Sequence, residues 1–175
     1  MNNEKDNVYD LVEDFYAHDE GWNTLLRQEY AEGFLRMEAW KGKKNSDLYR
    51  SWDNLTMLCL YLGSAETFLG DMNADDFIDC IAWCGRNISE FTPDYKYTQD
   101  FLETCDRLFK YLKGKNAISN DTVPGTAAEI LLQEGKMNII LPDGSFDEAN
   151  AERAWSATPD IPAKIFLNIG ERLQE

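Results

Sequence analysis

The chain has 175 residues, of which 43% are hydrophobic and 13% aromatic, and its formal net charge is −15. This length suits one domain, and the apolar fraction is too high for a disordered chain. The negative charge disfavours binding to nucleic-acid phosphates and to anionic membrane surfaces, because both depend on Lys and Arg. It favours solubility and a basic protein partner.

Apolar residues that recur every three or four positions predict a series of helices in the first two thirds of the chain. The first helix is expected over residues 5–17. Its apolar stripe consists of Val8, Leu11, Val12, Phe15 and Tyr16. A single long helix is expected over about 22–40. Gly42 and the lysines around it indicate where this second helix ends, because cations are favoured at a helix C-terminus.

A third helix is predicted over residues 47–62. It is apolar on almost every face towards its end, so we expect it at the centre of the fold. A short helical turn is expected within 64–72. Asn73 then has the character of an N-cap, with Asp75 and Asp76 in the first turn, where the helix dipole favours anions.

The clearest helix signal is Thr92-Pro93-Asp94, which combines a capping hydroxyl, a proline for the first turn and an acid. The helix is expected to end at Gly114. Its apolar stripe consists of Tyr97, Phe101, Cys105, Leu108 and Leu112, with Leu102 and Phe109 beside it.

The remaining third of the chain has a different pattern. Residues 116–126 have the composition of a linker or surface loop. Lys136–Leu141 favours a strand, paired with Ile130–Gln133 or with Ser145–Phe146. In the alternative interpretation, Ala127–Leu132 is helical. Two short helices are expected over about 147–156 and about 162–173.

Together these patterns predict a mainly α fold: an orthogonal or irregular bundle of about five helices over residues 5–115, with a short β-hairpin and two short helices at the C-terminus. Residues 1–115 are expected to form the helical core domain. Residues 116–175 are expected to pack on the same core, which makes a single domain overall.

The four cysteines all fall among apolar neighbours in predicted helices. They are Cys59, Cys80, Cys84 and Cys105. Cys80 and Cys84 are four residues apart and could form half of a zinc site, but further ligands at suitable spacing are scarce. Core packing is the favoured interpretation. The polar first residues contain no apolar signal core, so we expect reduced thiols and a cytoplasmic location.

Other sites of chemistry lack the residues that they need. His18 is the single histidine, and its position at a predicted helix end favours a solvated side chain over a catalytic base. The acids from Asp71 to Asp75 begin like a calcium loop, but Asp76 stands where glycine is needed and Ala82 where glutamate is needed. We therefore expect no metal and no cofactor.

Two basic islands interrupt the acidic chain. The first consists of Arg36, Lys41, Lys43, Lys44 and Arg50, and the second of Arg107, Lys110, Lys113 and Lys115. Aromatic residues lie near both, as in some nucleic-acid sites. Charge compensation at helix ends and solvated faces explain both islands as well, and a nucleic-acid partner is not expected.

Three functions remain open at this point. The favoured one is a non-enzymatic protein–protein interaction or adaptor protein with an acidic surface and another protein, possibly basic, as its partner. The first alternative is an enzyme or small-molecule-binding protein whose site is built from scattered polar residues. The second is a nucleic-acid mimic that binds a basic protein, which needs the carboxylates of residues 4–32 and 66–79 on one face.

The candidate partner-binding residues follow from the first hypothesis. Trp40 and Trp155 lie near predicted helix ends, where they either stand exposed as anchors or cap the core, which is the favoured interpretation. Lys41, Lys43 and Lys44 lie next to Trp40 in the chain and complete the candidate set.

Overall fold

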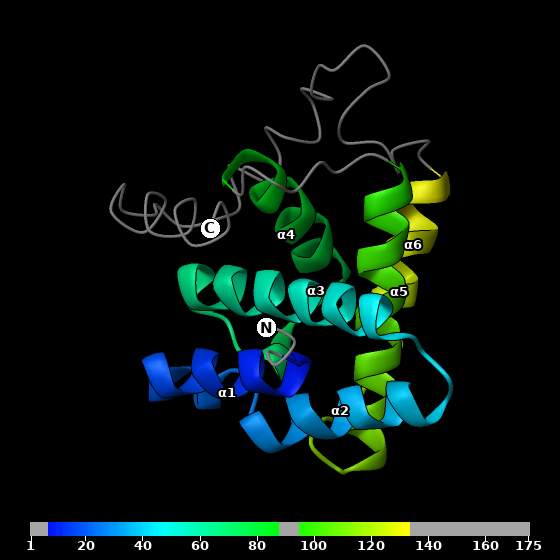
Figure 1. Cartoon of the computed structure of the whole chain (residues 1–175). Coiled ribbons are helices and arrows are strands. Elements are labelled where there is room, and N and C mark those ends of the chain that lie inside the picture. Colours follow the sequence, from blue (N-terminus) through cyan, green and yellow to red (C-terminus); the bar gives the residue numbers. More distant parts are fainter. Residues whose placement is uncertain (1–6, 88–94, 134–175) are drawn as a thin grey trace.

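The computed structural model describes residues 7–87 and 95–133, and its regular structure in these ranges is helical (Figure 1). The elements are α1 (Val8–His18), the 3-10 helix η2 (Glu20–Thr24), α2 (Gln28–Trp40), α3 (Asn45–Ala65), the 3-10 turn η3 (Leu69–Asp71), α4 (Ala74–Asn87), α5 (Tyr95–Gly114) and α6 (Val123–Gln133). The prediction of a mainly α fold is confirmed, and no strand occurs within the described ranges.

Helix α3 lies at the centre of the fold, as its apolar composition predicts. It packs against α1, α2, α4 and α5 (Figure 1). Side chains on several of its faces are buried, and they include Leu55, Met57, Leu58, Cys59, Leu60, Tyr61 and Leu62. A helix that is apolar all round avoids water only when other helices surround it.

Side-chain caps define where two of the helices begin. The Asn7 side chain accepts a hydrogen bond from the Asp10 amide at 3.0 Å, and the Asp10 carboxylate accepts one from the Asn7 amide. Asn73 and Asp76 form the same reciprocal pair before α4, with distances of 2.8 and 2.9 Å. Such pairs satisfy amides that have no partner within the helix. Capping rather than calcium binding therefore explains Asn73 and Asp76.

The prediction of one long helix over 22–40 is wrong, because the helical structure is interrupted between η2 and α2. Asp19 caps the start of η2 by accepting a hydrogen bond from the Gly21 amide. Between η2 and α2, the Asn23 side chain accepts a hydrogen bond from the Gln28 amide at 2.9 Å. The carbonyl of Leu26 accepts a hydrogen bond from the buried Tyr16 hydroxyl. Asn and Asp compete with helix formation in this way, and apolar spacing alone does not reveal it.

The predicted linker over 116–126 is also partly wrong, because α6 begins at Val123. Residues 130–133 are helical, so they do not pair with a strand, and the alternative of a helix over Ala127–Leu132 is confirmed. The other residues of the predicted hairpin and the two short C-terminal helices lie outside the described residues.

Helix α6 packs against α5 and α4, so the first part of the predicted C-terminal region belongs to the same core. Ala127 and Leu131 are fully buried in this contact. Two residues of the predicted stripes are instead exposed: Leu11 in α1 and Tyr97 in α5. Thr98 takes the inward position next to Tyr97.

Candidate functional site

The turn between α2 and α3 carries the candidate residues that the sequence identified. The Lys43 amide donates to the Glu38 carbonyl at 3.1 Å, and the Gly42 amide donates to the Ala39 carbonyl at 3.0 Å. Gly42 has φ of +100°. These two bonds and a left-handed glycine make a Schellman motif. The last turn of α2 therefore ends in a fixed geometry, and we call residues 40–44 the Trp40 corner.

Trp40 is the most exposed large apolar side chain of the described residues, at 89% of its full accessible area. Lys41 and Lys44 beside it are also exposed. The alternative that Trp40 caps the core is therefore wrong. A tryptophan in water forgoes the burial that normally stabilises such a side chain, and Trp40 is therefore free to contact another molecule.

The corner is fastened to the core through the carboxylate of Glu38, which is almost fully buried. Arg107 of α5 binds it with two hydrogen bonds, Nε to Oε2 at 3.0 Å and Nη2 to Oε1 at 3.2 Å. The Ser51 hydroxyl of α3 donates to Oε1 at 3.3 Å, and Lys43 Nζ lies 3.7 Å from the same oxygen. One carboxylate thus joins α2, α3 and α5.

The two basic islands are partly neutralised by the fold. Lys43 from the first and Arg107 from the second meet at Glu38. Lys110 pairs with Asp106 at 2.7 Å, four residues earlier in α5. Lys113 lies 3.7 Å from Asp121. The second island therefore serves mainly to compensate charge within α5 and its surroundings, whereas Lys41 and Lys44 of the first remain exposed.

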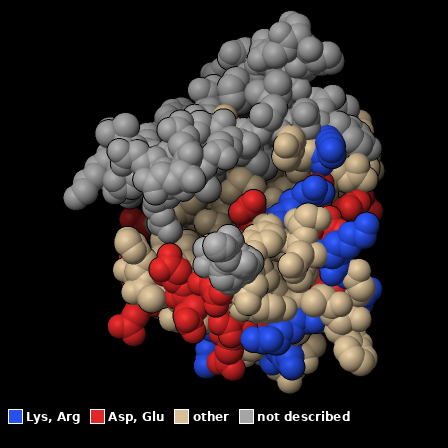
Figure 2. Space-filling view, viewed as in Figure 1, with Lys and Arg blue, Asp and Glu red and all other residues tan. Residues whose placement is uncertain are grey.

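The surface charge is unevenly distributed. Asp and Glu side chains gather over the side of the molecule where α1 lies, and Lys and Arg side chains are more frequent on the other side of this view, towards the α2–α3 turn (Figure 2). The exposed acids of α1 include Asp10, Glu13 and Asp14. The molecule therefore offers surfaces of opposite sign to a partner despite its negative net charge.

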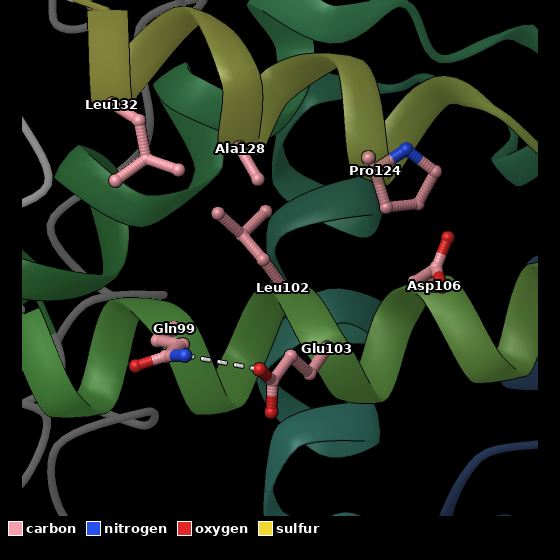
Figure 3. A pocket seen from close by; sticks show the side chains of 8 residues that line it. Gln99, Leu102, Glu103, Asp106, Pro124, Ala128 and Leu132 are labelled. Atoms are coloured by element: carbon pink, nitrogen blue, oxygen red, sulfur yellow. Dashed lines mark hydrogen bonds between the residues drawn. The ribbon is translucent and has the colours of Figure 1, made fainter.

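A second feature was not predicted from the sequence: an apolar groove between α5 and α6. Its volume is about 230 Å³. It is lined by Gln99, Leu102, Glu103, Asp106, Pro124, Gly125, Ala128 and Leu132. Leu102 and Ala128 face each other across it, and the polar side chains lie along α5 (Figure 3). The residue pattern Thr122-Val-Pro124 would have indicated the start of α6, as Thr92-Pro93 did for α5.

The four cysteines are all buried and free, which confirms the prediction of core packing. Burial raises the pKa of the Cys59 thiol to about 12 and also raises the pKa values of the Cys80 and Cys105 thiols. These thiols therefore stay protonated at neutral pH, and a protonated thiol is a poor nucleophile and metal ligand. No group of three or more potential ligands able to hold a metal ion occurs among the described residues.

Two residues that the sequence analysis considered remain, His18 and Trp155. His18 is the last residue of α1 and is exposed, as predicted. Trp155 lies outside the described residues.

None of the helices in the described ranges has both the length and the apolar character needed to cross a membrane. Searches among protein-family models, curated proteins and solved structures found no match to this chain.

Proposed function

We propose that this chain is a non-enzymatic protein–protein interaction protein of the cytoplasm, and that it docks a partner protein through the Trp40 corner. The exposure of Trp40 is the observation that carries the proposal. Tryptophan is among the residues most enriched in the energetically dominant centres of interfaces. Truncation of such an anchor costs at least about 2 kcal/mol of binding free energy, which is roughly a 30-fold loss of affinity.

The rigidity of the corner supports the same proposal. The Schellman bonds of Gly42 and Lys43 fix the backbone on one side of Trp40. The buried Glu38 carboxylate, two residues before Trp40, fixes the other side against α3 and α5. A side chain presented on a fixed backbone loses less conformational entropy when a partner binds.

The charges at the corner define which part of a partner can approach it. Lys41 and Lys44 favour an acidic patch around the pocket that receives Trp40. The acidic side of the molecule over α1 favours a basic region, in line with the net charge. A partner with both regions would be oriented as well as bound.

The two alternatives have less support. The groove between α5 and α6, at about 230 Å³, is smaller than the roughly 300–1,000 Å³ of typical small-molecule sites. A larger hollow of about 500 Å³ has no acidic side chain in its lining, which among the described residues consists of Lys113, Asn116, Ala117, Ile118 and Ser119. A nucleic-acid mimic needs the acids of residues 4–32 and of residues 66–79 on one face. Residues 68–70 do line a hollow together with residues 23–27, but Asp79 is buried and cannot contribute to such a face.

Affinity capture with matched variants tests the proposal. Trp40→Ala should abolish capture of the specific partner and leave the thermal stability unchanged, because the side chain is exposed. Phe68→Ala is the control, since Phe68 is another exposed aromatic residue, at 59%, on a different part of the surface. Capture by the wild type should weaken with salt, because screening acts on Lys41 and Lys44. Equal capture by wild type and Trp40→Ala would refute the proposal.

A further inference from the structure

We propose that the groove between α5 and α6 is a second docking site, separate from the Trp40 corner, and that its occupant is a basic amphipathic helix of a partner protein. The groove runs between two helices that lie antiparallel and side by side (Figure 3). Leu102 forms its buried floor, and Leu132 at one end is 54% exposed. An apolar groove of this kind can accept apolar side chains from outside.

The spacing of the lining residues argues for a helix as the occupant. Pro124, Ala128 and Leu132 succeed one another at intervals of four, so they form one flank of α6. Their eight-residue span corresponds to about 12 Å along the helix axis. A partner helix lying in the groove presents apolar side chains at positions i, i+4 and i+7 over a similar length. A volume of about 230 Å³ suits inserted side chains better than a whole ligand.

The charge of the lining argues for a basic occupant. The charged residues that line the groove are Glu103 and Asp106, both on α5. Glu103 accepts a hydrogen bond from the neutral Gln99 side-chain amide at 3.1 Å. Asp106 is paired with Lys110, which does not line the groove. Lys or Arg side chains beside the apolar stripe of a partner helix would meet the Glu103 carboxylate, whose charge Gln99 does not offset.

The test uses a synthetic helical peptide of 15 residues as the probe, with Leu at positions i, i+4 and i+7 and with Lys and Arg elsewhere. Its binding to the full chain is measured by titration calorimetry. We expect saturable binding at a stoichiometry of one. Ala128→Phe fills the groove and should weaken binding by about tenfold or more, which corresponds to the loss of one good apolar contact. Leu132→Ala removes an exposed lining side chain without risk to the fold and should weaken binding as well.

A matched pair of charge variants separates groove binding from general attraction to an acidic protein. Glu103→Gln lies at the groove, and Glu13→Gln makes the same change in net charge on α1. We expect Glu103→Gln to weaken binding by about threefold, as for a charge at an interface rim, and Glu13→Gln to have no effect. Methyl signals of Leu102, Ala128 and Leu132 should shift on titration of the probe.

The proposal would be overturned by an absence of saturable binding, by equal weakening in Glu103→Gln and Glu13→Gln, or by equal binding of a peptide in which Glu replaces every Lys and Arg. Tight binding of the wild type that Ala128→Phe and Leu132→Ala leave intact would also overturn it. Trp40→Ala should bind the probe like the wild type, so this test and the capture experiment at the Trp40 corner can fail independently.

Discussion

Replacing Glu38 by glutamine should destabilise the fold far more than the loss of an ordinary surface charge. The Glu38 side chain is 2% exposed and receives two hydrogen bonds from Arg107 and one from Ser51. Breaking a fully buried ion pair costs about 3–5 kcal/mol. The side chains of Arg107 and Lys43 are 31% and 32% exposed, so both cations regain part of their hydration. We therefore expect Glu38→Gln to lower the free energy of unfolding by about 2–4 kcal/mol.

Urea denaturation followed by circular dichroism measures this loss directly. Glu29→Gln is the control, because Glu29 pairs with Arg27 at the surface, where the two side chains are 60% and 62% exposed. Surface pairs contribute about 0–1 kcal/mol. In a double-mutant cycle, Glu38→Gln and Arg107→Met should show a coupling above about 1 kcal/mol. A loss for Glu38→Gln no larger than that for Glu29→Gln would refute the role assigned to this carboxylate.

Three further predictions concern the corner, the thiols and the core. Gly42→Ala should cost about 1 kcal/mol in urea denaturation, because Gly42 is left-handed at φ of +100°, whereas Gly114→Ala, at a helix end with open space around it, should cost nothing. The raised pKa of Cys59 keeps more protons on the folded than on the unfolded state above about pH 8.5. The contribution of these thiols to the free energy of unfolding should therefore be constant below that pH and fall as pH rises towards 12, by about 1.4 kcal/mol per pH unit for each such thiol. A flat stability profile between pH 9 and 11, by thermal melting, would contradict this. Leu58→Ala, at a fully buried site of α3, should cost about 2–5 kcal/mol, and Leu132→Ala, at an exposed site, should cost less than about 1 kcal/mol by the same assay.

The sequence predicts best where a single physical signal dominates. The apolar character of almost every face of α3 towards its end favours a central position for it, and the apolar neighbours of Cys59 and Cys105 favour burial of both thiols. Asn73 was predicted as a cap because its side chain acts on amides only three residues away. Each of these inferences depends either on a contact between residues close in the chain or on burial that the apolar neighbours predict whichever way the residue faces.

The predictions fail where hydrogen bonds of polar side chains, or contacts between residues far apart in the chain, determine the structure. The interruption before α2 is stabilised by the bond from the Gln28 amide to the Asn23 side chain and by the bond from the Tyr16 hydroxyl to the Leu26 carbonyl, and apolar periodicity reveals neither. The pairing of Glu38 with Arg107 joins residues 69 positions apart. The groove forms only because α5 and α6 lie side by side. It was not predicted because residues 116–126, which include the start of α6, were interpreted as a linker. Exposure of Trp40 was one of two open interpretations, because position near a helix end does not determine on which side of the helix a residue lies.

The central claim is that Trp40 is exposed because it binds another protein. A photo-reactive phenylalanine analogue placed at position 39 of the full chain, in living cells, tests this claim most directly, because Ala39 is exposed and lies beside an intact Trp40. The same analogue at position 68 is the comparison. We predict a discrete cross-linked adduct from position 39 that position 68 does not give, and that disappears when Trp40 is changed to Ala. An absence of adducts from position 39, the same adducts from both positions, or adducts that persist in the Trp40→Ala variant would contradict the account.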